Sequence, residues 1–162
     1  MCSSDLHEQG AAFAACGYAQ ASGKPGVAYA TSGPGATNLI TGICDAYFDS
    51  IPVVFITGQV NTFESRGQYG VRQRGFQETD IVSMVAPVTK YAKYVESAEK
   101  IKYYLDTAFV VATSGRMGPV LLDIPMNIFR AEIEPDMFSL LSSFLLALTF
   151  FIGSFKCPKF IN

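Results

Sequence analysis

One carboxylate in the sequence lies where acid–base chemistry is plausible. Glu8 follows His7, the only histidine of the chain, and precedes a run rich in glycine and alanine that allows a bulky group to approach closely. His-Glu also opens the HExxH zinc motif, but that motif needs a second histidine where this sequence has Ala11. Zinc hydrolysis is therefore excluded. Glu8 also has a purely structural interpretation, as an acidic residue favoured by the dipole at a helix N-terminus.

A glycine-containing turn offers a second place for chemistry. Gly33-Pro34-Gly35 follows a short apolar run and leads into a helical pattern, and the free N–H groups at such a helix start can hold a phosphate. The dinucleotide fingerprint needs a third glycine where Asn38 stands, and the P-loop needs Gly-Lys followed by Ser or Thr. The turn alone is equally consistent with a tight turn that has no ligand.

Composition and charge exclude several classes of protein. The chain has 162 residues and a formal net charge of −2, so it lacks the basic character of most nucleic-acid-binding domains. With one histidine and no Cys-x-x-Cys pair, the four cysteines favour neither a zinc site nor a disulfide framework. The first residues contain no basic stretch followed by an apolar one, which predicts a cytoplasmic protein without a signal peptide.

The elements that must position these residues alternate between helix and strand. The apolar spacing predicts helices over 8–21, 36–48, 81–85 and 98–112, and strands over 26–31, 52–57, 88–95 and 120–124. The run 52–57 is continuously apolar, as expected for a strand that is covered on both faces. A long polar loop, 58–75, carries three arginines, and long loops in compact domains are often functional. The predicted fold class is α/β, with a parallel sheet and helices on both faces.

The end of the chain differs from the rest. No charged residue occurs from Met137 to Phe155, whereas every acidic residue lies at or before Asp136. We therefore divide the sequence into a domain, 1–130, and an uncharged apolar tail, 131–162. The tail has four interpretations: a membrane anchor, a buried terminal helix, a cover for another domain, or residues translated out of the natural reading frame. The last is the preferred interpretation.

Several short motifs occur together in a fixed order. They are His7-Glu-Gln-Gly-Ala11, Ala30-Thr-Ser-Gly-Pro-Gly-Ala-Thr-Asn38, Asp49-Ser-Ile-Pro-Val-Val-Phe-Ile-Thr-Gly-Gln59, Phe76-Gln-Glu78 and Ser114-Gly-Arg-Met-Gly-Pro-Val-Leu-Leu-Asp-Ile-Pro125. In this combination the chain resembles the N-terminal, pyrimidine-binding domain of thiamine diphosphate enzymes of the acetolactate synthase group, from about Leu6 to Ile128. The resemblance implies the thiamine diphosphate-binding fold. It also implies that this copy is incomplete at its N-terminus, since a strand-helix-strand segment precedes the first motif in the family.

The resemblance gives Glu8 a catalytic role. In the family the glutamate of this motif hydrogen-bonds N1′ of the cofactor's aminopyrimidine ring and favours the tautomer that removes the thiazolium proton. A partly buried carboxyl with a raised pKa suits such proton sharing, because burial disfavours the charged form. We therefore expect a raised pKa at Glu8, and we expect Glu8→Gln to keep the fold and lose activation.

Further residues follow from the same motifs. The resemblance implies that Pro34 and Asn38 lie beside the pyrimidine ring, and that Gln77 and Phe76 reach toward the thiazolium and the substrate. Arg116 matches an arginine that touches FAD in those family members that carry it.

The implied activity is that of a carboligase or decarboxylase acting on 2-keto acids such as pyruvate. The cofactors are thiamine diphosphate, Mg²⁺ bound through a diphosphate-binding domain that these motifs do not include, and FAD in some members. The cofactor lies between two subunits in the family, so the resemblance implies a homo-oligomer, and a chain with one half-site is expected to be inactive alone. The alternative is a non-catalytic interaction module that pairs with a full-length relative.

Overall fold

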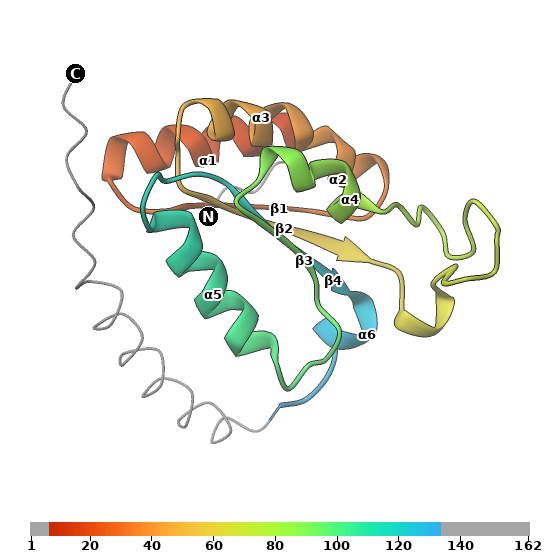
Figure 1. The fold of residues 1–162 in the computed structure, drawn as a ribbon. Coiled ribbons are helices and arrows are strands. Elements are labelled where there is room, and N and C mark those ends of the chain that lie inside the picture. The colour runs from red at the N-terminus through yellow and green to blue at the C-terminus, as the bar shows by residue number, and fades with distance from the viewer. Residues whose placement is uncertain (1–6, 134–162) are drawn as a thin grey trace. The chain divides into compact units, whose positions relative to one another are not determined.

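Four parallel strands form the centre of the computed structural model, which describes residues 7–133. They are β1 (Gly26–Ala30), β2 (Val53–Gln59), β3 (Tyr91–Tyr94) and β4 (Val120–Pro125), in the order β1-β2-β4-β3. All three pairings are parallel. The predicted parallel sheet is thus confirmed, and the carboxyl ends of all four strands lie at one edge (Figure 1).

Helices cover both faces of this sheet, as predicted (Figure 1). Helices α1 (Glu8–Ser22), α3 (Ile40–Phe48) and α4 (Ile81–Val85) pack on one face. Helix α5 (Ile101–Thr113) packs on the other face. Each face has its own apolar core, which explains why the sequence of β2 is continuously apolar from Val53 to Ile56 rather than alternating.

Strand β2, one of the two central strands, contributes side chains to both cores. Val53 and Phe55 of β2 belong to the core under α1 and α3, whereas Val54 between them belongs to the core under α5. All three side chains are fully buried. Because successive side chains of a strand point to opposite faces, a strand in this position needs apolar residues at every step.

Small residues let α1 lie close to its neighbours. A Cβ atom added at Gly42 of α3 would collide with the Cβ of Ala12, and one added at Gly26 of β1 would collide with the carbonyl oxygen of Ala15. The alanines and glycines of this part of the sequence are therefore needed for packing. They fix the position of α1, and with it the position of Glu8 at its first turn.

Some elements differ from the sequence-based expectations. The helix expected over 36–48 is two helices, α2 (Pro34–Asn38) and α3, because Leu39 turns tightly and its N–H bonds to the carbonyl of Ala36 at 3.2 Å. Strand β3 is shorter than expected because a 3₁₀ turn, η2 (Ala86–Val88), contains a proline and precedes it.

Two short elements were not expected, namely the 3₁₀ turn η1 (Thr62–Glu64) and helix α6 (Met126–Phe129). Helix α5 begins later than expected, at residue 101. The turn η1 and helix α6 span only three and four residues, too few to give a periodic signal.

Most of the apolar tail, residues 134–162, lies outside the described residues, so its four interpretations remain untested. Within residues 7–133, no helix is both long and apolar enough to span a membrane.

The close packing of α1 leads to a stability prediction. Gly42→Ala should lower the free energy of unfolding by roughly 1–3 kcal/mol, because the added methyl group overpacks the contact with Ala12. Urea denaturation followed by circular dichroism measures this. Gly17→Ala in α1 is the matched control, since its added methyl group meets no atom within 4 Å and should stabilise the helix by about 0.5–1 kcal/mol. Equal effects of the two substitutions would contradict the packing account.

Candidate functional site

Residues from three segments of the chain meet at the carboxyl edge of the sheet. Glu8 opens α1, whose last residues lead directly into β1, so the start of α1 lies near the end of that strand. Pro34 follows the end of β1, and Gln77 lies in the long connection that follows β2. Contacts between these segments, described next, show that the fold brings them together.

Glu8 and Asn38 are joined directly. The side-chain amide of Asn38 donates a hydrogen bond of 3.0 Å from Nδ2 to Oε2 of Glu8. The ring Nδ1 of His7 accepts from the backbone N–H of Gln9 and caps the helix that carries Glu8. Thus a residue at the end of α2 fixes the orientation of a carboxylate at the start of α1.

The expected raised pKa of Glu8 is wrong for this structure. The hydrogen bond from Asn38 is the main reason why the pKa of Glu8 lies below its ordinary value, and a backbone hydrogen bond adds to the effect. Burial acts in the opposite direction but is weaker, because Glu8 is only half-buried in the described residues. Hydrogen bonds to a carboxylate favour its charged form, so the structure presents Glu8 as an acceptor.

The Gly33-Pro34-Gly35 turn touches both Glu8 and Gln77. A Cβ atom at Gly33 would lie 2.7 Å from Cβ of Gln77 and 2.8 Å from its carbonyl oxygen. A Cβ atom at Gly35 would lie 2.7 Å from Cγ2 of Thr31 and 3.2 Å from Oε1 of Glu8. Gly33 also has φ of 64°, which suits glycine. The two glycines are therefore needed for the close approach of these segments.

The remaining predicted site residues have different environments. Pro34 lies exposed at the start of α2, and Phe76 is exposed over 81% of its surface. Gln77 is half-buried and has a positive φ of 57°, which is uncommon for a residue with a side chain.

Arg116 lies at the opposite edge of the sheet. It precedes β4, and its Nε donates a hydrogen bond of 2.8 Å to Oγ of Ser50, which precedes β2. Its guanidinium also donates to the carbonyl of Phe48 at 3.4 Å. The structure thus gathers Glu8, Asn38 and Gln77 and leaves Arg116 beyond the amino ends of the strands.

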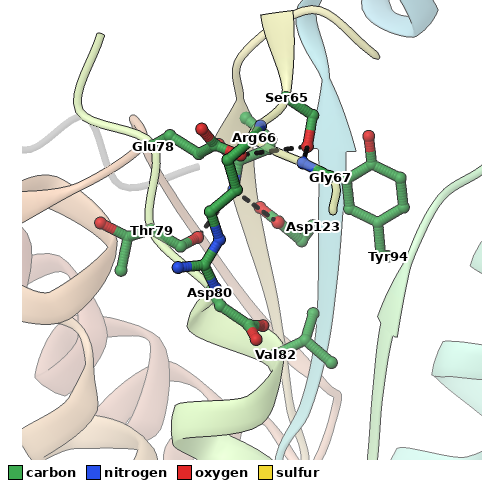
Figure 2. A pocket seen from close by; sticks show the side chains of 10 residues that line it. Ser65, Arg66, Gly67, Glu78, Thr79, Asp80, Val82, Tyr94 and Asp123 are labelled. Atoms are coloured by element: carbon green, nitrogen blue, oxygen red, sulfur yellow. Dashed lines mark hydrogen bonds between the residues drawn. The ribbon is translucent and has the colours of Figure 1, made fainter. Parts of the chain in front are cut away.

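Sequence reasoning missed a polar pocket next to this site. The pocket has a volume of about 340 Å³ and lies where β2 and β4 end, with Asp123 between Glu78 and Tyr94 (Figure 2). Asp123 is only 2% exposed; its Oδ1 accepts from Oγ1 of Thr57 at 2.7 Å and its Oδ2 from Nε2 of Gln59 at 3.0 Å. An aspartate inside the apolar run Val120–Ile124 was the signal that could have revealed it.

Burial raises the pKa of Asp123 to about 6, although the hydrogen bonds from Thr57 and Gln59 lower it in part. Desolvation disfavours the charged carboxylate more than these two donors favour it.

Glu78 organises the loop that covers the pocket. Its carboxylate accepts hydrogen bonds from Oγ of Ser65 and from the backbone N–H groups of Arg66, Arg74 and Gly75, at 2.7–3.3 Å. Burial alone would raise the pKa of Glu78, but these donors together lower it. The Glu78 carboxylate therefore connects the two ends of the ten-residue loop 66–75 by hydrogen bonds.

The family of the chain follows from a comparison with family models. The model described as "Thiamine pyrophosphate enzyme, N-terminal TPP binding domain" matches residues 2–84, about half of the chain. The chain belongs to the thiamine pyrophosphate enzyme family. The match includes Glu8, the Gly33–Gly35 turn and Gln77, which are the segments that meet at the carboxyl edge.

Relatives in this thiamine pyrophosphate enzyme family agree with the assignment. The chain is 53% identical to the acetolactate synthase isozyme 2 large subunit of Escherichia coli over 131 residues, which cover 80% of the chain and 23% of that protein. It is 52% identical to the chloroplastic acetolactate synthase of Arabidopsis thaliana over 130 residues, 80% of the chain and 18% of that protein. The chain thus spans about a fifth of the length of these curated relatives.

Asp123 gives a prediction about pH. The pKa of Asp123 is higher in the folded protein than its ordinary value of 3.8, so folding favours the protonated form. Its contribution to stability is therefore present below about pH 4 and is lost as pH rises to about 6, by roughly 3 kcal/mol in total. Asp123→Asn should remove this dependence.

Urea denaturation of both proteins between pH 4 and 7.5 provides the test. The free energy of unfolding of the wild type, relative to that of Asp123→Asn, should fall across this range. Glu64→Gln, at an exposed carboxylate, is the control. A constant difference between wild type and Asp123→Asn would show that Asp123 does not titrate in this interval.

Proposed function

We propose that this domain supplies the pyrimidine-binding half of a thiamine diphosphate site in a carboligase or decarboxylase that acts on 2-keto acids such as pyruvate. The observation that supports this most is the arrangement of Glu8, which is oriented by Asn38 and lies against the backbone cradle of Gly35. The names of the relatives, acetolactate synthases, support the reaction class.

The residues present fit the aminopyrimidine part of this cofactor. Gly35 carries no Cβ that would crowd Thr31 and Glu8, so the Glu8 carboxylate can lie directly against the turn that would flank the ring. A ring nitrogen that carries a proton needs an acceptor, which Glu8 provides in its charged form. When bound, thiamine diphosphate supplies the nucleophile and the electron sink for breaking the bond next to a keto acid's carbonyl group.

Glu8 is the proposed catalytic residue. One of its oxygens accepts the hydrogen bond from Asn38, and in our proposal the carboxylate also accepts a hydrogen bond from N1′ of the pyrimidine ring. Covering of the site by a second domain would desolvate Glu8 and raise its pKa, which would bring the carboxyl closer to equal sharing of that proton. Asn38 limits this rise, because it stabilises the charged form.

The other site residues have positioning and substrate roles in this proposal. Pro34 and Asn38 flank the pyrimidine ring from α2. Gln77 and Phe76 reach from the loop after β2 toward the thiazolium and the keto acid, and the large exposed surface of Phe76 suits a residue that a substrate or a second domain covers.

The proposed assembly requires further parts. Residues 1–130 form the pyrimidine-binding domain, and a diphosphate-binding domain of another subunit in a homo-oligomer holds Mg²⁺ and the diphosphate. FAD, where used, would contact Arg116, which lies beyond the amino ends of the strands and thus on the opposite side from Glu8. The proposed location is the cytoplasm.

A complementation assay tests this proposal. The 162-residue chain is combined with the remainder of the Escherichia coli isozyme 2 large subunit, expressed separately, together with thiamine diphosphate and Mg²⁺. We expect pyruvate consumption that falls at least 100-fold in Glu8→Gln, since positioned acid–base groups contribute about 10²–10⁴-fold. Glu99→Gln, the same chemical change at an exposed carboxylate just before α5, which packs on the face of the sheet opposite to α1, should retain the wild-type rate.

Two results would contradict the proposal. One is turnover that survives Glu8→Gln. The other is formation of a stable complex without turnover, which the interaction-module alternative predicts.

A further inference from the structure

A hydrogen-bonded path leads from the middle of the sheet to the segment that carries Phe76 and Gln77. Gln59, the last residue of β2, is its centre, and it is only 8% exposed. Its Nε2 donates to Oδ2 of Asp123 at 3.0 Å and to the backbone carbonyl of Thr79 at 2.8 Å. Its Oε1 accepts from the N–H of Val60 at 3.0 Å.

These three partners allow only one orientation of the Gln59 amide. The Val60 N–H can only donate, so it requires the oxygen of the amide on its side. The Thr79 carbonyl and the ionised Asp123 can only accept, so they require the NH₂ group on theirs. Reversal of the amide would therefore break all three hydrogen bonds.

Asp123 is the fixed end of this path. It lies in β4, is 2% exposed, and its second oxygen is held by the hydroxyl of Thr57 in the neighbouring strand β2. A buried carboxylate with both oxygens hydrogen-bonded is a rigid anchor, because loss of either partner leaves a desolvated acceptor unsatisfied.

The other end of the path holds a strained backbone. Thr79 lies two residues after Gln77, whose φ of 57° costs about 1–3 kcal/mol for a residue with a side chain. Such a conformation persists only when the surroundings enforce it. Contact with Gly33 enforces it on one side, and the Gln59–Thr79 hydrogen bond holds the chain on the other.

We propose that Asp123 and Gln59 are positioning residues that hold the Phe76–Gln77 segment against the Gly33–Gly35 turn. The inference rests on the proposed function, in which this segment faces the thiazolium and the substrate. Neither residue touches the cofactor in this account. Both act through the Thr79 carbonyl, so they determine where Gln77 lies rather than which chemistry it performs.

Two substitutions remove the path in different ways. Asp123→Asn keeps the shape but leaves one acceptor oxygen for the two donors, Thr57 and Gln59, that the aspartate accepts from, so one of these two hydrogen bonds loses its acceptor. Gln59→Met keeps the volume and removes every polar atom of the bridge. If Asp123→Asn does not fold, Gln59→Met alone tests the inference. Val120→Ala, a buried change in β4 on the face of α5, is the control for general loss of stability.

Hydrogen exchange of the full chain is the first readout. The amides of Arg74, Gly75 and Glu78 are bonded within this segment, at 3.1–3.3 Å. We expect them to exchange at least about 10-fold faster in Asp123→Asn and Gln59→Met, with the amides of α1 unchanged after correction for global stability. The same acceleration in Val120→Ala, or none in Asp123→Asn and Gln59→Met, would overturn the inference.

Kinetics of the complemented enzyme are the second readout. Asp123→Asn and Gln59→Met should lower kcat about 10-fold or more, whereas Val120→Ala should change only thermal stability. If wild-type chain gives no turnover, the proposed function fails, and the exchange data still decide whether the segment is held in this way. If wild type turns over and both variants keep its kcat, the positioning role is wrong and the proposed function stands.

Discussion

The close packing of α1 against α3 and β1 determines where the candidate site lies. Ala12 meets Gly42 and Ala15 meets Gly26 so closely that a side chain on either glycine would overpack the contact. This contact fixes the start of α1 near the end of β1, and there Asn38 can reach Glu8. The alanines of α1 are thus needed for close packing, and this packing also determines where the Glu8 carboxylate lies.

Because all strands are parallel, their carboxyl ends lie at one edge of the sheet and their amino ends at the opposite edge. The candidate residues fall into two groups, one at each of these edges. Glu8, Asn38 and Gln77 lie in segments at the carboxyl edge, the usual place for ligand sites in open α/β sheets. Arg116 comes from a connection at the amino edge and is held by Ser50. Any group that Arg116 binds therefore approaches the domain from the side opposite to Glu8.

Much of this organisation was predictable from the sequence, because it follows from long patterns and from motif order. The apolar run at 52–57 predicted a strand covered on both faces, which β2 confirms, and α1 was predicted to within one residue at its end. The motif order identified the family, which the match to residues 2–84 confirms.

Other features depend on contacts between distant residues, which no local pattern encodes. The break at Leu39 and the path from Asp123 through Gln59 to Thr79 are of this kind. The sign of the pKa shift at Glu8 is another, because it depends on the position of the Asn38 amide. Arg116 shows the limit of motif order, since a motif names a residue but does not say at which edge of the sheet it lies.

The central claim is that Glu8, the Gly33–Gly35 turn and Gln77 form one surface for an aminopyrimidine ring. A crystal structure of the chain in complex with the complementing domain and thiamine diphosphate tests it most directly. The account predicts a Glu8 carboxylate oxygen about 2.6–3.2 Å from N1′ of the ring, with the ring over the backbone at Gly35. A pyrimidine ring bound elsewhere, for example at the amino edge beside Arg116, would contradict it.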